Sequence, residues 1–249
     1  SQNSAHGDSV VKELQAEGGS AVCTQLELCD PASILGARDF ISQRYFISQR
    51  YKKLDILVNN AAVCFNDPTL YGACEYTPFD KQAGITVSTN FFGTLGVTRA
   101  MMPLLKTSPS PRVIFLASNA GRLSILRSQE KIGAFTSPTL QIDHLEQLMR
   151  DFISDVENGD HASKGWPNTC YGMSKLGVIA LTNLLARDEP QMSVNCVDPG
   201  YCCTDQNANQ GPRSAEEGAR TPVSLALLPD STAKKVTGQY WMDGAEKAW

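Results

Sequence analysis

The chain has 249 residues, of which 42% are hydrophobic and 19% charged, and its formal net charge is -4. This composition favours a packed core over disorder, and the length suits a single α/β domain. The charge gives no reason to expect nucleic acid or a membrane surface as a partner, no apolar run reaches the ~18 residues of a membrane span, and the polar start does not resemble a signal peptide.

The eight cysteines are scattered, no two form a C-x-x-C pair, and the chain has three histidines. This spacing does not match that of metal ligands. We therefore expect free, buried thiols and a cytoplasmic location, where thiols stay reduced.

Helix-like and strand-like segments alternate from the start of the chain. Helical spacing of apolar residues predicts a helix over Asp8–Gly18, and a strand follows over Ala21–Leu28. Asp30 and Pro31 then form an N-cap and first helical position. The helix that they open contains FISQRY twice, at 40–45 and 46–51, which we interpret as a local duplication or an assembly artefact.

The middle of the chain continues the alternation with one interruption. Leu54–Asn59 reads as a strand buried on both faces, and Phe79–Leu105 as a long helical region that ends near Pro103. Arg112–Ala117 reads as a second buried strand. Residues 124–165 then break the rhythm as a polar, helical insertion.

The last third completes the pattern with helices over Asn168–Asp188 and Ala215–Leu228 and strands over Met192–Val197 and Val236–Met242. Such alternation predicts an α/β fold, with helices on both faces of a parallel sheet. We see no linker, so we expect one domain over residues 1–249.

A tyrosine and a lysine with catalytic potential lie on the helix predicted over Asn168–Asp188. Tyr171 and Lys175 are four residues apart, which places both side chains on one face. A nearby ammonium favours the phenolate, so the tyrosine proton becomes transferable. The spacing alone is weak evidence, because a surface pair on a helix looks the same.

Small or polar residues follow the predicted strands, where ligands bind in open parallel sheets. They include Ser118, the run Asn59–Ala62, the turn Asp198–Gly200 and, just beyond it, Thr204. Asn90 lies inside a helix, where asparagine is unfavourable. Each has a simple alternative, a serine in a turn or an asparagine facing solvent, but their coincidence favours a site.

With these motifs, the chain resembles the short-chain dehydrogenase/reductase family, and more closely its monomeric carbonyl reductase branch. The matching segments cover nearly the whole chain and are NNAA at 59–62, TNFFGT at 89–94, Ser118, KGWP at 164–167, YGMSK at 171–175, DPGYCCTD at 198–205 and EEGARTPVSLALLP at 216–229. The resemblance implies a Rossmann-type, doubly wound parallel sheet.

The resemblance also implies a role for each catalytic position. Tyr171 would be the general acid, and Lys175 would lower its pKa and bind the nicotinamide ribose. Ser118 would hold the substrate oxygen, and Asn90 would support a proton relay through water to Lys175. The implied reaction is NADPH-dependent reduction of ketone, aldehyde or quinone carbonyls. The alternatives are a catalytically inactive remnant or a nucleotide-sensing binding protein on the same fold.

The implied cofactor site draws on residues from three regions. Glu27 and Leu28 would contact the adenine, and Asn60 would line the site. Cys202, Cys203 and Thr204 would contact the nicotinamide carboxamide, with Tyr201 facing the substrate.

The chain departs from the family at several positions. Ala62 stands where glycine is usual, Glu27 where aspartate is usual, and Ala117 where serine is usual. The family's first strand, Gly-rich turn and second strand have no counterpart before Asp8–Gly18, so we expect an N-terminally truncated fold that is poorly stable and binds NADPH weakly or not at all. The residues that select NADP over NAD lie in that segment, so NADPH rests on the branch alone and NADH stays open.

We also expect a monomer. In the wider family, the helices after Ser118 and around Tyr171 commonly pair between subunits, and the insertion at 124–165 is long enough to cover that face. Five of its residues would pack inward: Ile142, Leu145, Leu148, Met149 and Phe152.

Overall fold

The computed structural model describes residues 4–48, 53–65 and 76–249. Its five-stranded sheet has the order β1-β2-β3-β4-β5. Strands β1 to β4 run parallel, and β5 pairs antiparallel with β4. The bounds are Ile56–Asn59 for β1, Arg112–Leu116 for β2, Ser193–Asp198 for β3, Tyr240–Met242 for β4 and Ala245–Lys247 for β5. The predicted α/β fold with a parallel sheet is confirmed.

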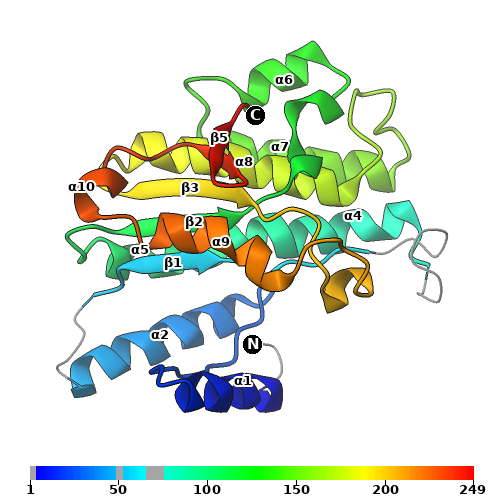
Figure 1. Cartoon of the computed structure of the whole chain (residues 1–249). Coiled ribbons are helices and arrows are strands. Elements are labelled where there is room, and N and C mark those ends of the chain that lie inside the picture. The colour runs from blue at the N-terminus through cyan, green and yellow to red at the C-terminus, as the bar shows by residue number, and fades with distance from the viewer. Residues whose placement is uncertain (1–3, 49–52, 66–75) are drawn as a thin grey trace.

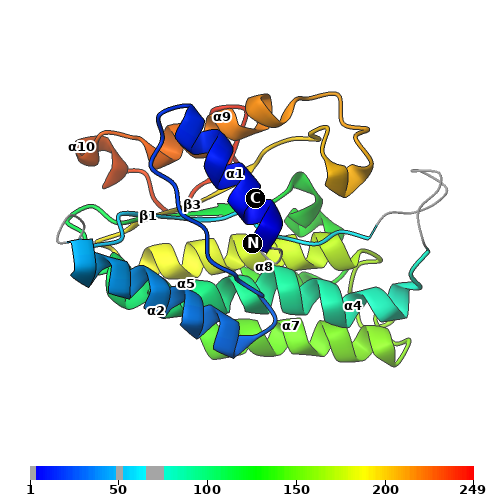
Figure 2. The same ribbon diagram turned by 90° about the horizontal axis from the view of Figure 1, so that it is seen from below.

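Helices cover both faces of this sheet (Figures 1 and 2). Helix α9 (Ala215–Ala226) packs on β2 and β3 from one side. On the other side, α5 (Thr94–Leu105) packs on β1, and α8 (Cys170–Asp188) packs on β2 and β3. Helix α2 (Pro31–Ser48) packs on α5, and α1 (Ser4–Ala16) lies below the sheet in Figure 1. The short α10 (Asp230–Ala233) precedes β4.

The helical region predicted over Phe79–Leu105 is continuous but changes its winding. It consists of α4 (Phe79–Val87), a π-helix over Ser88–Gly93, and α5. Pro103 lies inside α5, which ends two residues later at Leu105. The π-helical segment was not predicted, and it holds Asn90.

The segment 124–165 contains α6 (Gln129–Phe135) and α7 (Ile142–Glu157). Helix α7 packs against α4 and α8. Four of the five residues predicted to point inward, Leu145, Leu148, Met149 and Phe152, are buried, while Ile142 is half-buried at the edge of the core. Trp166 closes the segment. Its ring lies against Phe135 and Phe152, and its Nε1 donates to Asp155 at 2.7 Å.

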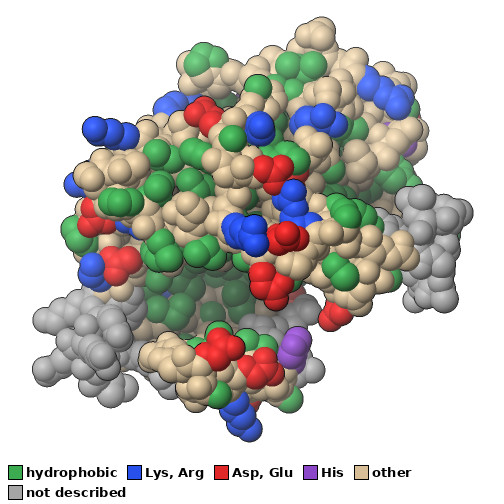
Figure 3. All heavy atoms as spheres, in the orientation of Figure 1, with side chains coloured by type: hydrophobic (Ala, Val, Ile, Leu, Met, Phe, Trp, Pro, Cys, Tyr) green, Lys and Arg blue, Asp and Glu red, His purple; other side chains and the backbone are tan. Residues whose placement is uncertain are grey.

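Two predictions for the first quarter of the chain are wrong. Residues 21–27 have no regular secondary structure, so the segment predicted as a strand over Ala21–Leu28 is not one, and it pairs with no described strand. Strand β1 is not buried on both faces, because none of its four residues is fully buried and Val58 is 44% exposed. Figure 3 shows hydrophobic side chains in the hollow between α1 and the sheet.

The other local predictions have mixed outcomes. The Asp30 cap is present, since Oδ1 accepts the N–H of Ala32 at 2.9 Å. Strand β5 was not predicted, and the FISQRY repeat extends past Ser48, outside the described residues. The seven cysteines of the described residues are free, as expected. Of these seven, only Cys170 and Cys196 are buried, whereas buried thiols were expected throughout. Within the same residues, no helix has both the length and the apolar character that crossing a membrane requires.

Candidate active site

The turn after β2 places Ser118 at the carboxyl end of the sheet. All five residues of β2 are buried, and the chain leaves the core at Ser118, whose Oγ accepts the N–H of Ala120 at 3.2 Å. A 3-10 turn, Asn119–Gly121, follows. A Cβ on Gly121 would lie 2.6 Å from the backbone of α8 at Leu176, so glycine lets this turn pack directly on the helix.

Helix α8 brings Tyr171 and Lys175 to the same place. Thr169 caps the helix, and its Oγ1 accepts the N–H of Gly172 at 2.9 Å. The Lys175 side chain is buried, its Nζ donates to the Leu116 carbonyl at 2.6 Å, and it lies 5.5 Å from the centre of the Tyr171 ring. The Tyr171 hydroxyl is hydrogen-bonded to Ser118. The serine, tyrosine and lysine therefore form one cluster at the strand end.

Burial controls the ionisation of this cluster. It lowers the pKa of Lys175 to about 8, while electrostatic interactions with Cys64 and Asp198 act in the opposite direction. Burial also raises the pKa of Tyr171, and Cys64 and Asp198 add to that rise, whereas the Ser118 hydrogen bond opposes it. Lys175 is not among the causes of this rise, so the lowering of the tyrosine pKa by Lys175 stays a prediction. The phenol keeps its proton, as a proton donor must.

Asn90 is buried and does not face solvent. Its Oδ1 accepts the N–H of Val63 at 2.8 Å, and its Nδ2 donates to the Val63 carbonyl at 2.9 Å and to Ser174 Oγ at 3.0 Å. The side chain thus joins the segment after β1 to α8, one residue before Lys175. In this arrangement Asn90 is bound to backbone and to Ser174, and its predicted part in a water relay stays a prediction.

The residues predicted to hold the adenine end lie beside the π-helix. A Cβ on Gly93 would be 2.7 Å from Leu28, so the two segments touch, and Cys29 Sγ is 3.2 Å from Thr89 Oγ1. The Glu27 backbone N–H donates to Ser33 Oγ at 2.9 Å.

The residues predicted at the nicotinamide end occupy the ends of β1 and β3. Asn60 and Cys203 are exposed, and Cys202 and Thr204 are half-buried. The Thr204 backbone N–H donates to Asn207 Oδ1 at 3.2 Å, which fixes the turn after Cys203. Tyr201 is 47% exposed beside them.

Two titratable residues near the cluster were missed as site residues. Cys64 and Asp198 both influence the ionisation of Tyr171 and Lys175. Asp198 was recognised as part of a polar strand end, but a sequence does not show how its carboxylate is directed. For Cys64 we see no signal in the sequence.

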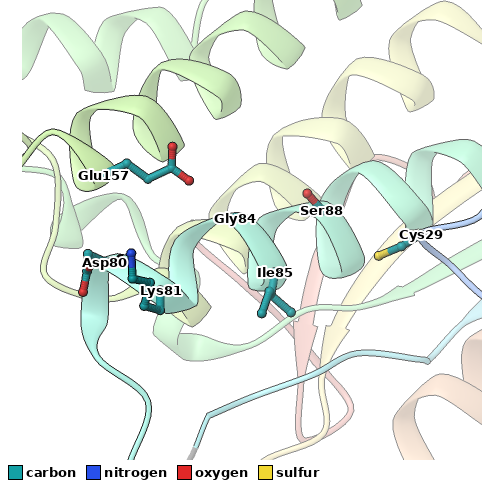
Figure 4. Close-up of a pocket in the computed structure, with 7 residues that line it drawn as sticks. All are labelled: Cys29, Asp80, Lys81, Gly84, Ile85, Ser88 and Glu157. Carbon is teal, nitrogen blue, oxygen red and sulfur yellow. Dashed lines mark ion pairs between the residues drawn. The ribbon is translucent and has the colours of Figure 1, made fainter.

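A separate cavity of about 610 Å³ lies along α4 (Figure 4). Its walls are formed by Cys29, Asp80, Lys81, Gly84, Ile85, Ser88 and Glu157. None of the four predicted catalytic residues lines it, so its size does not identify it as the site of the chemistry. Among the described residues, no group of three or more histidine, cysteine or acidic side chains could hold a metal ion.

Comparison with known proteins identifies the family. Residues 1–129 match the family model of the short chain dehydrogenases. Carbonyl reductase (NADPH) 3 of Rattus norvegicus is 39% identical over 257 aligned positions, which cover 100% of this chain and 87% of the relative. The chain belongs to the short chain dehydrogenase family.

Other relatives agree with this short chain dehydrogenase assignment. Carbonyl reductase (NADPH) 1 of Rattus norvegicus is 37% identical over 100% of this chain and 87% of its own length. Among solved structures, salutaridine reductase from Papaver somniferum superposes with a TM-score of 0.82 at 26% identity, covering 96% of this chain and 88% of that one. Menthone neomenthol reductase from Mentha piperita gives 0.76 at 27% identity, with coverage of 98% and 88%.

Proposed function

We propose that this short chain dehydrogenase reduces ketone, aldehyde or quinone carbonyls to alcohols with NADPH. The observation that carries the proposal is the cluster of Ser118, Tyr171 and Lys175 at the carboxyl end of β2. The names of the relatives, NADPH-dependent carbonyl reductases at 37–39% identity, supply the cofactor and the substrate class.

The residues at the strand ends fit the nicotinamide half of such a cofactor. A lysine ammonium has three N–H donors, and Lys175 directs one to the Leu116 carbonyl, which leaves donors for ribose hydroxyls. Exposed Asn60 follows β1 and half-buried Thr204 lies beyond the end of β3, the strands on either side of β2. The carboxyl ends of parallel strands are the usual position of a ligand in an open sheet. NADPH would supply the hydride when bound.

The chain itself supplies the proton and the orientation. Tyr171 has a raised pKa, so its phenol carries a proton at neutral pH. The proposed role of this phenol is to give the proton to the carbonyl oxygen as that oxygen gains charge. Ser118 Oγ, bonded to the same phenol, is placed to donate a hydrogen bond to that oxygen. Lys175 would bind the ribose and replace the tyrosine proton, and Asn90 would hold the segment after β1 against α8.

At the other end of the cofactor, we propose that Glu27 and Leu28 contact the adenine, and that Cys202 and Cys203 lie beside the carboxamide with Thr204. We also propose a monomer, since α7 covers α4 and α8, and a reducing compartment such as the cytoplasm, which suits the free thiols.

The test replaces Tyr171→Phe, which removes the phenolic hydroxyl and keeps the ring. NADPH oxidation in the presence of an aromatic aldehyde or a quinone should fall by roughly 10²–10⁴, while NADPH binding measured by calorimetry stays unchanged. Tyr76→Phe, at a 63% exposed residue, is the matched control. Turnover by Tyr171→Phe at the rate of the parent would exclude the tyrosine as the acid. NADPH binding without turnover by the parent would favour a binding protein.

A further inference from the structure

Asp198 is a buried carboxylate that the proposed reaction does not use. It is 5% exposed and ends β3, the strand next to β2. Its two oxygens accept backbone hydrogen bonds from different turns. Oδ2 accepts the N–H of Asn119 at 2.8 Å, and Oδ1 accepts the N–H of Gly200 at 2.7 Å.

These two N–H groups belong to the two turns that border the site. Asn119 directly follows Ser118, so the first bond fixes the backbone that carries the serine hydroxyl. Gly200, with a φ of +81°, opens the turn that leads to Tyr201 and Cys202. Because the Asp198 side chain accepts hydrogen bonds from both turns, it fixes the distance between the substrate side and the nicotinamide side of the site.

The same carboxylate acts electrostatically on the cluster. The titratable groups that face Lys175 are Tyr171 on its own helix, Cys64 after β1, and Asp198 at the end of β3. Tyr240 on β4, near Arg122, faces Asp198 from the other side. Among these groups, Asp198 is the one carboxylate. Its charge opposes the desolvation that lowers the pKa of Lys175.

We propose that Asp198 is a positioning residue of this site, whose buried carboxylate ties the Ser118 turn to the Gly200 turn and presents a negative charge to Lys175. This inference rests on the proposed function for its effect on rate, but its electrostatic part concerns the resting protein alone.

Two substitutions separate the two roles. Asp198→Asn removes the charge, and one of its two terminal atoms becomes an N–H donor that cannot accept from Asn119 or Gly200. Asp198→Glu keeps the charge but moves the oxygens outward by one methylene, so the two turns lose their common acceptor. Asp151→Asn, on the exposed face of α7, is the control for loss of one negative charge.

The electrostatic readout is an NMR titration of protein labelled at the lysine ε-carbon, with the Lys175 signal assigned by its loss in Lys175→Met. The midpoint should be about 8 in the parent and in Asp151→Asn. It should be lower in Asp198→Asn and close to that of the parent in Asp198→Glu. The same midpoint in Asp198→Asn and the parent would overturn the electrostatic role.

The positional readout is kcat for carbonyl reduction as a function of pH. Both Asp198 variants should lose about 10- to 100-fold, because small displacements of reacting groups cost this much. In Asp198→Asn alone, the alkaline limb should also move to lower pH. Parent-like kcat in both variants would overturn the positioning role. If Asp198→Asn does not fold, Asp198→Glu decides that role alone. A parent without carbonyl reduction would refute the proposed function, and the NMR titration would still decide whether Asp198 acts on Lys175.

Discussion

The contact between the Ser118 turn and α8 can be tested by adding one methyl group. In Gly121→Ala, the new Cβ would lie 2.6 Å from both the Leu176 nitrogen and the Lys175 carbonyl carbon. Both are backbone atoms of a buried helix and cannot rotate away. The turn must therefore move outward by about 0.8 Å to reach an ordinary contact of 3.4 Å.

That displacement has two measurable consequences. Overpacking of this kind destabilises a protein by about 1–3 kcal/mol, which chemical denaturation followed by circular dichroism will show. The shift also moves Ser118 relative to Tyr171, and a misplacement near 1 Å can lower the rate of a positioned reaction by about 10²-fold. We expect kcat for NADPH-dependent carbonyl reduction to fall by about 10- to 100-fold.

The matched control is Gly133→Ala in α6, where no atom lies within 4 Å of the added Cβ. This variant should keep the activity of the parent and be equally or slightly more stable, because alanine is the better helix former. Parent-like activity and stability in Gly121→Ala would refute the reasoning, since the turn would then not need its close approach to α8.

Two further predictions follow from the burial of Lys175 and from the packing of α7. The pKa of Lys175 is about 8 in the folded protein against 10.5 for an ordinary lysine, so the unfolded chain binds more protons between these values and the contribution of Lys175 to stability grows as pH rises from 8 toward 10.5. Between pH 7.5 and pH 10, the free energy of unfolding in urea should increase for the parent relative to Lys175→Met. The same difference between the two proteins at both pH values would contradict this prediction. Because α7 covers α4 and α8, light scattering at micromolar concentration should show a monomer, and a stable dimer or tetramer would be the contrary result.

Sequence patterns predict β2 well, because its residues after Arg112 form a continuous apolar run. Strand β3 was also predicted, although Ser193, Asn195 and Asp198 interrupt its apolar residues. Composition is a poorer guide at the β1 edge of the sheet. Ala21–Leu28 has strand-forming residues, yet a strand also requires a partner, and no described strand pairs with it. Val58 has an apolar side chain in an apolar run, but its exposure depends on what covers β1.

In the site, too, some features could be predicted from the sequence and others depend on the fold. Tyr171 and Lys175 could be placed together because helical spacing fixes their relative positions, and Ser118 could be placed near them because parallel strands end at one edge. The pKa shift of Tyr171 could not be predicted, because it depends on burial in the fold and on electrostatic interactions with Cys64 and Asp198, which come from distant segments. Asn90 was flagged as unusual for a helix, but its bonds to Val63 and Ser174 require the fold.

The π-helical segment Ser88–Gly93 changes how α4 is rotated relative to α5. A π-turn holds one residue more than an α-turn, and each residue rotates an α-helix by about 100°. The extra residue acts as a phase shift, so that α4 presents Ala83 and Val87 to the core beside α7 and α8, while α5 faces β1 and α2. Deleting Ser88 would restore regular winding but rotate the buried face of α4 by about 100° relative to α5. Helices α4 and α5 thus face different neighbours, and the one additional residue of the π-helix lets both sets of contacts form within one continuous helix.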